Sequence, residues 1–282
     1  MSQRGLFIRT VVVEAGAPGQ KGQRYAGLRT AFQIEHKAGG AASRGRIELY
    51  NAGAPALAVL RQRTNTVQLK VGYDGDERLL FRGNPMRDGV ELQVTGDGDR
   101  VIHVEASDGG RGTTNTHIVK SYARSVAMNA LLDEILDSTG WSLGQIDLPP
   151  SATTGGPLVV YQRPDEILDR IGEILVGTDP RGFDWQITDN ELHIIRRDGV
   201  RASSGVLISQ REGNLIGSPT ATRTGVKVRA LIDATLRPLQ GIQVQSDLVN
   251  GYFRVTDVTF SGDNWSNEFY MDITAKTIQR TP

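Results

Sequence analysis

The first 115 residues alternate apolar and polar side chains with a period of two. The alternation is clearest in the segments 31–37 (AFQIEHK), 46–51 (RIELYN) and 66–73 (TVQLKVGY). Such a period puts every second side chain on one face and is typical of strands with one buried face. Two more alternating runs, 89–95 and 100–107, flank the turn sequence GDGD and predict a β-hairpin. We therefore expect this end of the chain to be all-β.

The apolar spacing changes to a helical one after residue 120. Apolar side chains recur at about one turn of a helix over 122–137, between Ser121, a suitable N-cap, and Gly140, which ends the run. This spacing predicts an amphipathic helix.

A second helix is predicted beyond the Pro- and Gly-rich segment 148–157. Pro164 suits the first helical position, and Asp165 and Glu166 suit the positive end of the helix dipole. The apolar stripe expected on this helix, up to Gly177, consists of Ile167, Leu168, Ile171, Ile174 and Leu175. The following segment, 183–195, predicts a hairpin that turns at Asp189 and Asn190. The middle of the chain is therefore expected to be a small α/β unit.

The period of two returns from Val206 onward. It is seen in 225–231 (GVKVRAL), 241–247 (GIQVQSD), 252–260 (YFRVTDVTF) and 268–276 (EFYMDITAK). The segments 79–107 and 251–276 also share an order of features: a Phe followed by Arg, a strand, a Gly-Asp turn and a final alternating strand. This order fits two β domains of similar plan, and it equally fits two unrelated hairpins that use similar turns.

The distribution of charge supports a division into three units. Residues 1–120 carry 17 Lys/Arg and 12 Asp/Glu, residues 121–200 carry 6 and 13, and residues 201–282 carry 9 and 7. An acidic middle thus separates two mildly basic ends. Over the whole chain 32 basic residues balance 32 acidic ones, which argues against tight binding of nucleic acid.

The composition also limits the chemistry and the location of the protein. The chain has no cysteine, which excludes disulfides, thiolate catalysis and cysteine metal sites. Its first apolar run contains Arg9 and ends at Glu14, so we expect neither a signal peptide nor a membrane anchor. The expected product is unprocessed and cytosolic.

Several groups of residues are candidates for metal or phosphate sites. The acidic turns (Asp74, Asp76, Glu77 and Asp97, Asp99) lack the spacing of a calcium loop and suit hairpin turns. No two of the four histidines (His36, His103, His117, His193) have the i, i+4 spacing of a helical metal site, and three lie in predicted strands. The glycine-rich segment (Gly16, Gly19, Lys21, Gly22) lacks the Gly-Lys-Ser/Thr ending of a phosphate loop. We predict no metal and no cofactor.

Catalytic and sugar-binding candidates are equally few. The carboxylates of DEILD (133–137) and PDEILD (164–169) are expected on exposed helix faces, and no GxSxG motif is present. The three tryptophans, Trp141, Trp185 and Trp265, could stack on sugars, but they are scattered over the three units, and core or rim packing is the preferred interpretation. We predict no catalytic residue and no enzymatic activity.

One part of the chain resembles a known family. Residues 214–247 contain a Gly-Ser-Pro-Thr step (217–220), a Gly-Val strand and a Leu-rich turn with a Pro, and a Gly-Tyr strand with a Gly-Asp turn follows. This order is similar to that of the baseplate hub proteins of bacteriophage tails. The segments 183–199 and 80–94 resemble the small hairpin and the first barrel of that family.

The resemblance implies an α+β, β-dominated fold of two tail-tube-like antiparallel β-barrels (1–120 and 206–282) that flank a small α/β insertion (121–205). It further implies a homotrimer that joins a hexameric tail tube or distal tail protein to a trimeric central spike and surrounds the channel for DNA and tape-measure protein. DNA would pass only transiently. The chain ends at Pro282 without a spike or hydrolase motif, so we expect the spike to be a separate polypeptide. The alternatives are a receptor- or carbohydrate-binding β module and a glycan-cleaving tail enzyme.

Overall fold

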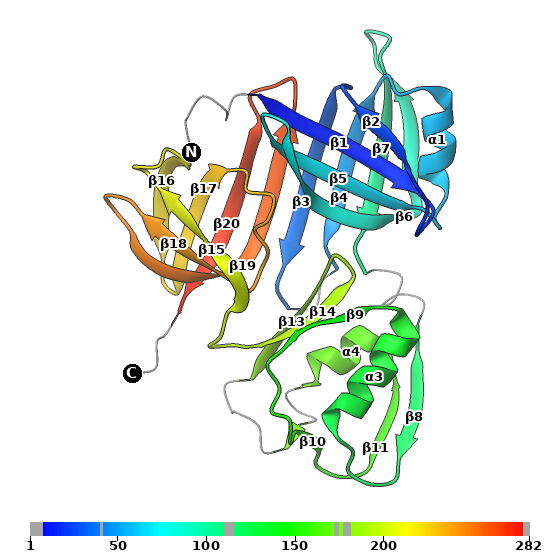
Figure 1. Cartoon of the computed structure of the whole chain (residues 1–282), viewed down its shortest axis with the longest axis vertical. Helices are drawn as coiled ribbons and strands as arrows, with labels where there is room; N and C mark the ends of the chain where they lie inside the picture. The colour runs from blue at the N-terminus through cyan, green and yellow to red at the C-terminus, as the bar shows by residue number, and fades with distance from the viewer. Residues whose placement is uncertain (1–7, 40–41, 110–115, 172–174, 177–181, 279–282) are drawn as a thin grey trace.

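The computed structural model describes residues 8–39, 42–109, 116–171, 175–176 and 182–278 (Figure 1). Strands dominate the fold. Along the sequence, a smaller middle unit separates an N-terminal from a C-terminal set of strands. The N-terminal set consists of β1 (Arg9–Gly16), β2 (Gln23–Ala26), β3 (Thr30–Lys37), β4 (Arg44–Tyr50), β5 (Thr66–Tyr73), β6 (Asp76–Val94) and β7 (Arg100–Ser107), with helix α1 (Ala54–Arg61). The C-terminal set consists of β15 (Arg201–Ser209), β16 (Leu215–Thr222), β17 (Gly225–Leu231), β18 (Gln240–Gln245), β19 (Asn250–Asp263) and β20 (Phe269–Thr277).

The two sets have the same topology. Neighbouring strands follow the order β1-β5-β6-β7-β4-β3 in the N-terminal set and β15-β18-β19-β20-β17-β16 in the C-terminal set. If β2 is set aside, the strands also occur in the same sequence order in both. One difference is that β1 pairs with β5 antiparallel, whereas β15 pairs with β18 in parallel. The hairpins β6–β7 and β19–β20, which correspond to the similar segments 79–107 and 251–276, occupy equivalent places.

Each set contains one long strand, β6 or β19, that takes part in two layers of strands: an outer layer with β5 or β18, and an inner layer with β7 or β20. The first half of β6 pairs with β5 and its second half with β7, and an irregularity lies between Pro85 and Val90. Strand β19 pairs with β18 through its first residues and with β3 beyond an irregularity between Val255 and Asp257. Such irregularities bend a strand and strengthen its twist. The bends let each set form a two-layered sandwich.

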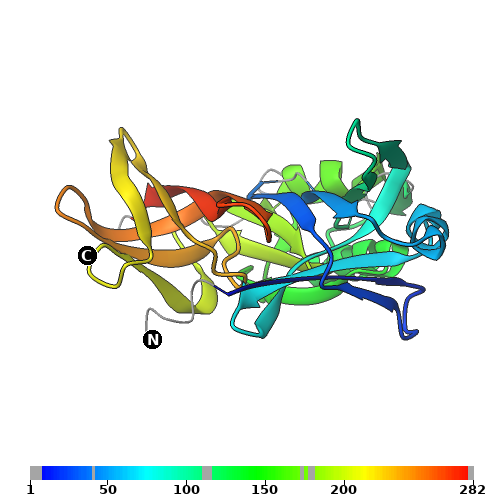
Figure 2. The ribbon, with the colours of Figure 1, turned by 90° about the horizontal axis from the view of Figure 1, so that it is seen from above.

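The inner layers of the two sets are continuous through the pairing of β3 with β19. The resulting eight-stranded layer, called the long layer below, has the order β6-β7-β4-β3-β19-β20-β17-β16. Its two outer hairpins, β16–β17 and β6–β7, rise on the same side in Figure 2. The predicted β-dominated α+β class is confirmed, but neither set closes into a barrel of its own. The backbone edge of β3 is instead satisfied by β19 of the other set.

One hydrophobic core serves both strand sets. Phe81 and Ile34 of the N-terminal set and Phe260 of the C-terminal set are fully buried in the same cluster. Phe32 and Tyr73 meet Phe269 edge-on, with ring centroids 5.9 and 5.5 Å apart. Burial of large aromatic rings across the β3–β19 joint therefore holds the sets together.

The middle unit has a second hydrophobic core. It contains strands β8 (Ile118–Tyr122), β9 (Ser142–Ile146), β10 (Thr153–Thr154), β11 (Leu158–Gln162), β12 (Leu175–Val176), β13 (Phe183–Thr188) and β14 (Glu191–Arg196), and helices α3 (Met128–Thr139) and α4 (Pro164–Asp169). The hairpin β13–β14 reaches the strand sets, while β8, β11 and the helices lie away from them (Figure 1). Its turn residues Asp189 and Asn190 have positive φ angles of 56° and 69°, as the predicted hairpin requires.

Three predicted elements differ from the structure. The N-terminal end is not all-β, because residues 54–61 form α1. The first helix begins at Met128 and not after Ser121, which lies in β8 and pairs with β11; its end at Gly140, with φ of 72°, is confirmed. The second helix ends at Asp169, so Leu175 lies in β12, and Ile174 is outside the described residues.

Candidate functional site

The long layer has a polar face opposite to its buried face. Phe32 and Ile34 of β3 point into the core, whereas Gln33 and Lys37 between and beyond them are exposed. The same alternation occurs in β17 and β20, where the apolar side chains are buried and the polar ones face outward. We call the outward side chains of these eight strands the polar face. Because the register is unbroken across β3–β19, the polar face extends over both strand sets.

Among the strand-paired side chains of the polar face that are exposed or half-buried, positive and negative charges are equal in number; Asp263 and Arg254 lie on the same side but are buried. The six cationic residues are Lys37, Arg44, Arg46, Lys227, Arg229 and Lys276, and the six anionic ones are Glu35, Glu48, Glu91, Glu105, Asp257 and Asp272. Formal charges therefore cancel on this surface. A surface without net charge releases few counterions from a nucleic acid and binds it weakly.

Opposite charges on the polar face are paired across neighbouring strands. The guanidinium Nε of Arg46 lies 3.1 Å from a carboxylate oxygen of Glu105, directly opposite on β7. Arg229 donates two hydrogen bonds, of 2.7 and 2.9 Å, to the carboxylate of Asp272 on β20. Exposed pairs of this kind each add about 0.2–1 kcal/mol to stability. Their larger effect is to cancel the charge locally, within a few ångströms.

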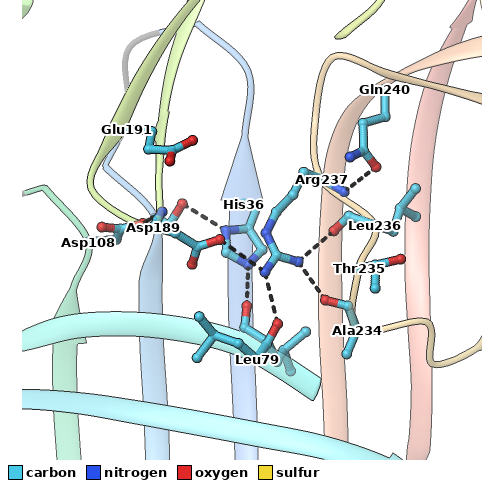
Figure 3. A network of polar contacts seen from close by, with 12 residues as sticks. His36, Leu79, Asp108, Asp189, Glu191, Ala234, Thr235, Leu236, Arg237 and Gln240 are labelled. Carbon is cyan, nitrogen blue, oxygen red and sulfur yellow. Dashed lines mark hydrogen bonds and ion pairs between the residues drawn. The ribbon is translucent and has the colours of Figure 1, made fainter. Parts of the chain in front are cut away.

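A buried polar junction joins the two strand sets to the middle unit (Figure 3). Its centre is Arg237, which lies in the loop between β17 and β18 and is 5% exposed. Its guanidinium donates hydrogen bonds to the backbone carbonyl oxygens of Ala234 (2.7 Å), Leu236 (3.0 Å) and Leu79 (3.0 Å). It also lies 3.5 Å from the carboxylate of Asp189. A single side chain thus bonds to β6, to its own loop and to the β13–β14 turn.

The same turn is held by Asp108, which follows β7. Its buried carboxylate accepts a hydrogen bond of 2.8 Å from the backbone N–H of Asp189. Burial and the neighbouring charge of Asp189 raise the pKa of Asp108 to about 7, although backbone N–H groups and Arg237 oppose the shift. Arg254 of β19 adds a second buried contact to the hairpin, 2.8 Å from Asp184. The position of the middle unit is therefore set by buried charged groups.

His36 lies beside this junction and is held neutral. Its Nε2 is 3.3 Å from the carbonyl oxygen of Leu80, and its Nδ1 is 2.8 Å from the hydroxyl of Ser43. Burial and the nearby Arg237 lower the pKa of His36 to about 3. Since both ring nitrogens are engaged, His36 is a structural residue of the core.

The other histidines are separate from one another. His103 lies on the polar face, 3.4 Å from Glu48, and His117 precedes β8. His193 of β14 accepts a hydrogen bond from the backbone of Gln145, and burial lowers its pKa to about 4. Among the described residues no group of three or more His, Asp or Glu side chains is arranged to hold a metal ion.

The turn residues noted in the sequence lie at separate turns. Asp74 lies in the β5–β6 turn, and Asp76 and Glu77 are the first residues of β6. Asp97 and Asp99 lie in the β6–β7 turn, where Asp99 accepts a hydrogen bond from Asn51. The glycine-rich segment from Gly16 to Gly22 connects β1 to β2. None of the described helices is long and apolar enough to cross a membrane.

The tryptophans do not form a common platform. Trp141 and Trp185 are buried in the core of the middle unit, as predicted. Trp265 lies in the β19–β20 turn and is 73% exposed, so the expectation of packing is wrong for this residue. The residues Arg237, Asp108 and Arg254 were not identified from the sequence. No motif marks them, because their burial depends on three units that meet in space.

Comparisons with known proteins agree with the fold. No protein-family model and no curated sequence matches the chain. The 43 kDa tail protein of prophage MuSo2 from Shewanella oneidensis has a similar structure, with a TM-score of 0.66 and 12% identity over 96% of this chain and 98% of that one. The tail protein from Neisseria meningitidis MC58 gives a TM-score of 0.61 with 10% identity over 94% and 96% of the two chains.

A protein of a secretion system is similar to the same extent. The E. coli c3393 protein, described as a component of the type VI secretion system with structural similarity to the T4 tail proteins gp27 and gp5, gives a TM-score of 0.64. Its identity is 14%, over 94% of this chain and 76% of that one. At such identities the similarity establishes the fold. The chain therefore has the fold of these phage tail proteins and of this type VI secretion component, as the resemblance in its sequence predicts.

Proposed function

We propose that the protein is a structural component of a phage tail, namely a trimeric baseplate hub that joins the tail tube to a central spike. The observation that carries this proposal is the duplicated topology: one chain holds two strand sets of the same order, joined side by side. Three such chains in a ring present six similar units. A ring of this kind can match a hexameric tube on one side and a trimeric spike on the other.

The polar face supports a place around the channel of the tail. In a ring built by continuing the long layer, one face of that layer lines the interior. A lining with equal numbers of cations and anions attracts phosphate weakly, so that DNA and tape-measure protein can pass without being held. The opposite face is the hydrophobic core and cannot face water.

The middle unit is proposed to lie at the periphery of the ring. Residues 121–200 carry 6 basic and 13 acidic residues, and like charges on three copies repel one another least when the copies are far apart and solvated. We further propose that 1–120, 121–205 and 206–282 are the three structural units of the chain, and that the tail tube, the spike and the tape-measure protein are its partners in the virion.

The mass of the purified chain over a range of concentrations tests this proposal. The hub predicts a trimer of the 30.7 kDa chain, or larger rings, in light scattering at high concentration. A carbohydrate- or receptor-binding module would remain a monomer and bind a glycan. A persistent monomer would therefore contradict the proposed hub, and glycan binding by that monomer would favour the binding module.

A further inference from the structure

The long layer ends in two strand edges that have no partner within the described chain. At one end β16 pairs only with β17. At the other end the second half of β6 pairs with β7 on one side only, since its pairing with β5 stops at Gly83. An unpaired edge exposes backbone N–H and C=O groups and readily accepts another strand. Both edges are therefore available to a second protein chain.

The chain contains its own example of how such edges join. Strand β3 is the last strand of the N-terminal order, as β16 is of the C-terminal order. The second half of β19 corresponds to the second half of β6, because both follow the bend of the long strand. In the chain, β3 pairs antiparallel with the second half of β19. By equivalence, β16 should pair with the second half of β6.

The registers of the two sets define which residues correspond. Ala106 of β7 and Ala275 of β20 each pair with the last residue before the bend, Pro85 and Val255. Ile102 lies four residues before Ala106, towards the β6–β7 turn, and pairs with Leu92. Met271 lies four residues before Ala275, towards the β19–β20 turn, and pairs with Phe260. Leu92 of β6 therefore corresponds to Phe260 of β19.

The same counting relates β3 to β16. Gly45 of β4 pairs with Ala106 on one neighbouring strand and with Ile34 on the other. In the same way, Val226 of β17 pairs with Ala275 and with Ala221. Ile34 therefore corresponds to Ala221. Within the chain, Ile34 lies opposite Phe260. The equivalent pair is Ala221 opposite Leu92.

We propose that β16 of one copy pairs antiparallel with the second half of β6 of the next copy, with Ala221 opposite Leu92, Thr220 opposite Gln93 and Thr222 opposite Glu91. This proposal rests on the proposed trimer and names the interface that closes it. Each copy offers one β16 edge and one β6 edge. The contact is therefore head-to-tail, and a chain of such contacts closes into a ring when the rotation permits.

The side chains at both edges fit the proposed register. Glu91, Gln93, Thr220 and Thr222 are exposed, and the pairing places them together on the polar face. Leu92 is half-buried against the core, and Ala221 opposite it is exposed in the single chain. Pro219 precedes Thr220 and has no backbone N–H. It lies at the end of the proposed pairing, where the loss of one backbone hydrogen bond is tolerated.

Disulfide trapping tests the proposed register directly. The chain has no cysteine, so the double variant Gln93→Cys with Thr220→Cys introduces the only two thiols. Directly opposite residues of an antiparallel pair have Cβ atoms about 4.5–5.5 Å apart, near the range that a disulfide spans. The matched control is Gln93→Cys with Thr274→Cys, a threonine on the same face of β20, two strands in from the β16 edge.

The expected result is covalent dimers and trimers of the first variant after mild oxidation, and none of the control. Light scattering of the wild-type chain runs in parallel. A trimer in solution without disulfides in the first variant would overturn the β16–β6 interface and leave the proposed hub intact. A monomer at every concentration, without disulfides, would overturn both. Equal cross-linking of both variants would indicate random collision and would also overturn the interface.

Discussion

Substitution of Arg237 by Met is predicted to be strongly destabilising. Methionine keeps much of the apolar stem but removes the guanidinium that bonds to the carbonyl oxygens of Leu79, Ala234 and Leu236. Each buried carbonyl left without a donor costs about 1–3 kcal/mol, although relaxation and entering water reduce the sum. Asp189 loses a partner 3.5 Å away, but its side chain is 32% exposed and water can replace part of that contact. We expect the free energy of unfolding to fall by about 3–5 kcal/mol.

The control for this variant is Arg229→Met on the polar face. Arg229 makes two short hydrogen bonds to Asp272, but its side chain is 46% exposed. Water takes over the lost bonds, so we expect a decrease of about 0.2–1 kcal/mol. Urea-induced unfolding, followed by far-ultraviolet circular dichroism, gives both values. Equal losses in the two variants would show that burial of Arg237 in the junction does not determine its contribution to stability.

Three further predictions concern the junction, the core and the polar face. Asp108→Asn should abolish a pH-dependent contribution to stability. Because the pKa of Asp108 rises from 3.8 to about 7 on folding, protonation favours the folded state, and the wild-type protein should lose on the order of 3 kcal/mol relative to the variant between pH 4 and pH 7 in urea unfolding. Parallel pH curves would contradict this. Phe260→Ala should lower the free energy of unfolding by about 3–5 kcal/mol, because the ring is fully buried, and a loss below about 1 kcal/mol would be inconsistent with a shared core. Glu48→Gln with Glu105→Gln should give the polar face two net positive charges, and fluorescence anisotropy should then show tighter, salt-sensitive DNA binding; unchanged binding would argue against charge balance as the cause of weak affinity.

Much of the strand structure could be predicted from the sequence. Strands β17, β19 and β20 alternate clearly because one face packs into the core and the other faces water. By contrast, β16 (LIGSPTAT) shows no alternation and contains Gly217 and Pro219, residues that are tolerated at an edge. Alternation of apolar and polar residues arises where one face of a strand is buried. It is therefore weak in a strand such as β16, which lies at an unpaired edge and is largely exposed.

Helix α1 was missed for a related reason. Its eight residues, APALAVLR, are too few to show a helical period, and they lie between strands. The Pro at its start was the one signal present. The second predicted helix, in contrast, was too long, because apolar residues beyond Asp169 continue the spacing into β12.

The contacts between units had no signal in the sequence. The β3–β19 joint pairs Phe32 with Gly262, residues at opposite ends of the chain, and Arg237 meets Asp189 only after both strand sets and the middle unit have folded. Local patterns reflect local periodicity and turns, whereas these contacts depend on topology. The similarity of segments 79–107 and 251–276 was the single trace of that topology in the sequence.

A reconstruction by electron microscopy of the tail that contains this protein tests the central claim most directly. The account predicts three copies in a closed ring, with the two strand sets at equal radius and the polar face lining the channel. It predicts the middle units on the outside. A ring in which the two strand sets occupy different radii, or in which the polar face points away from the channel, would contradict the account.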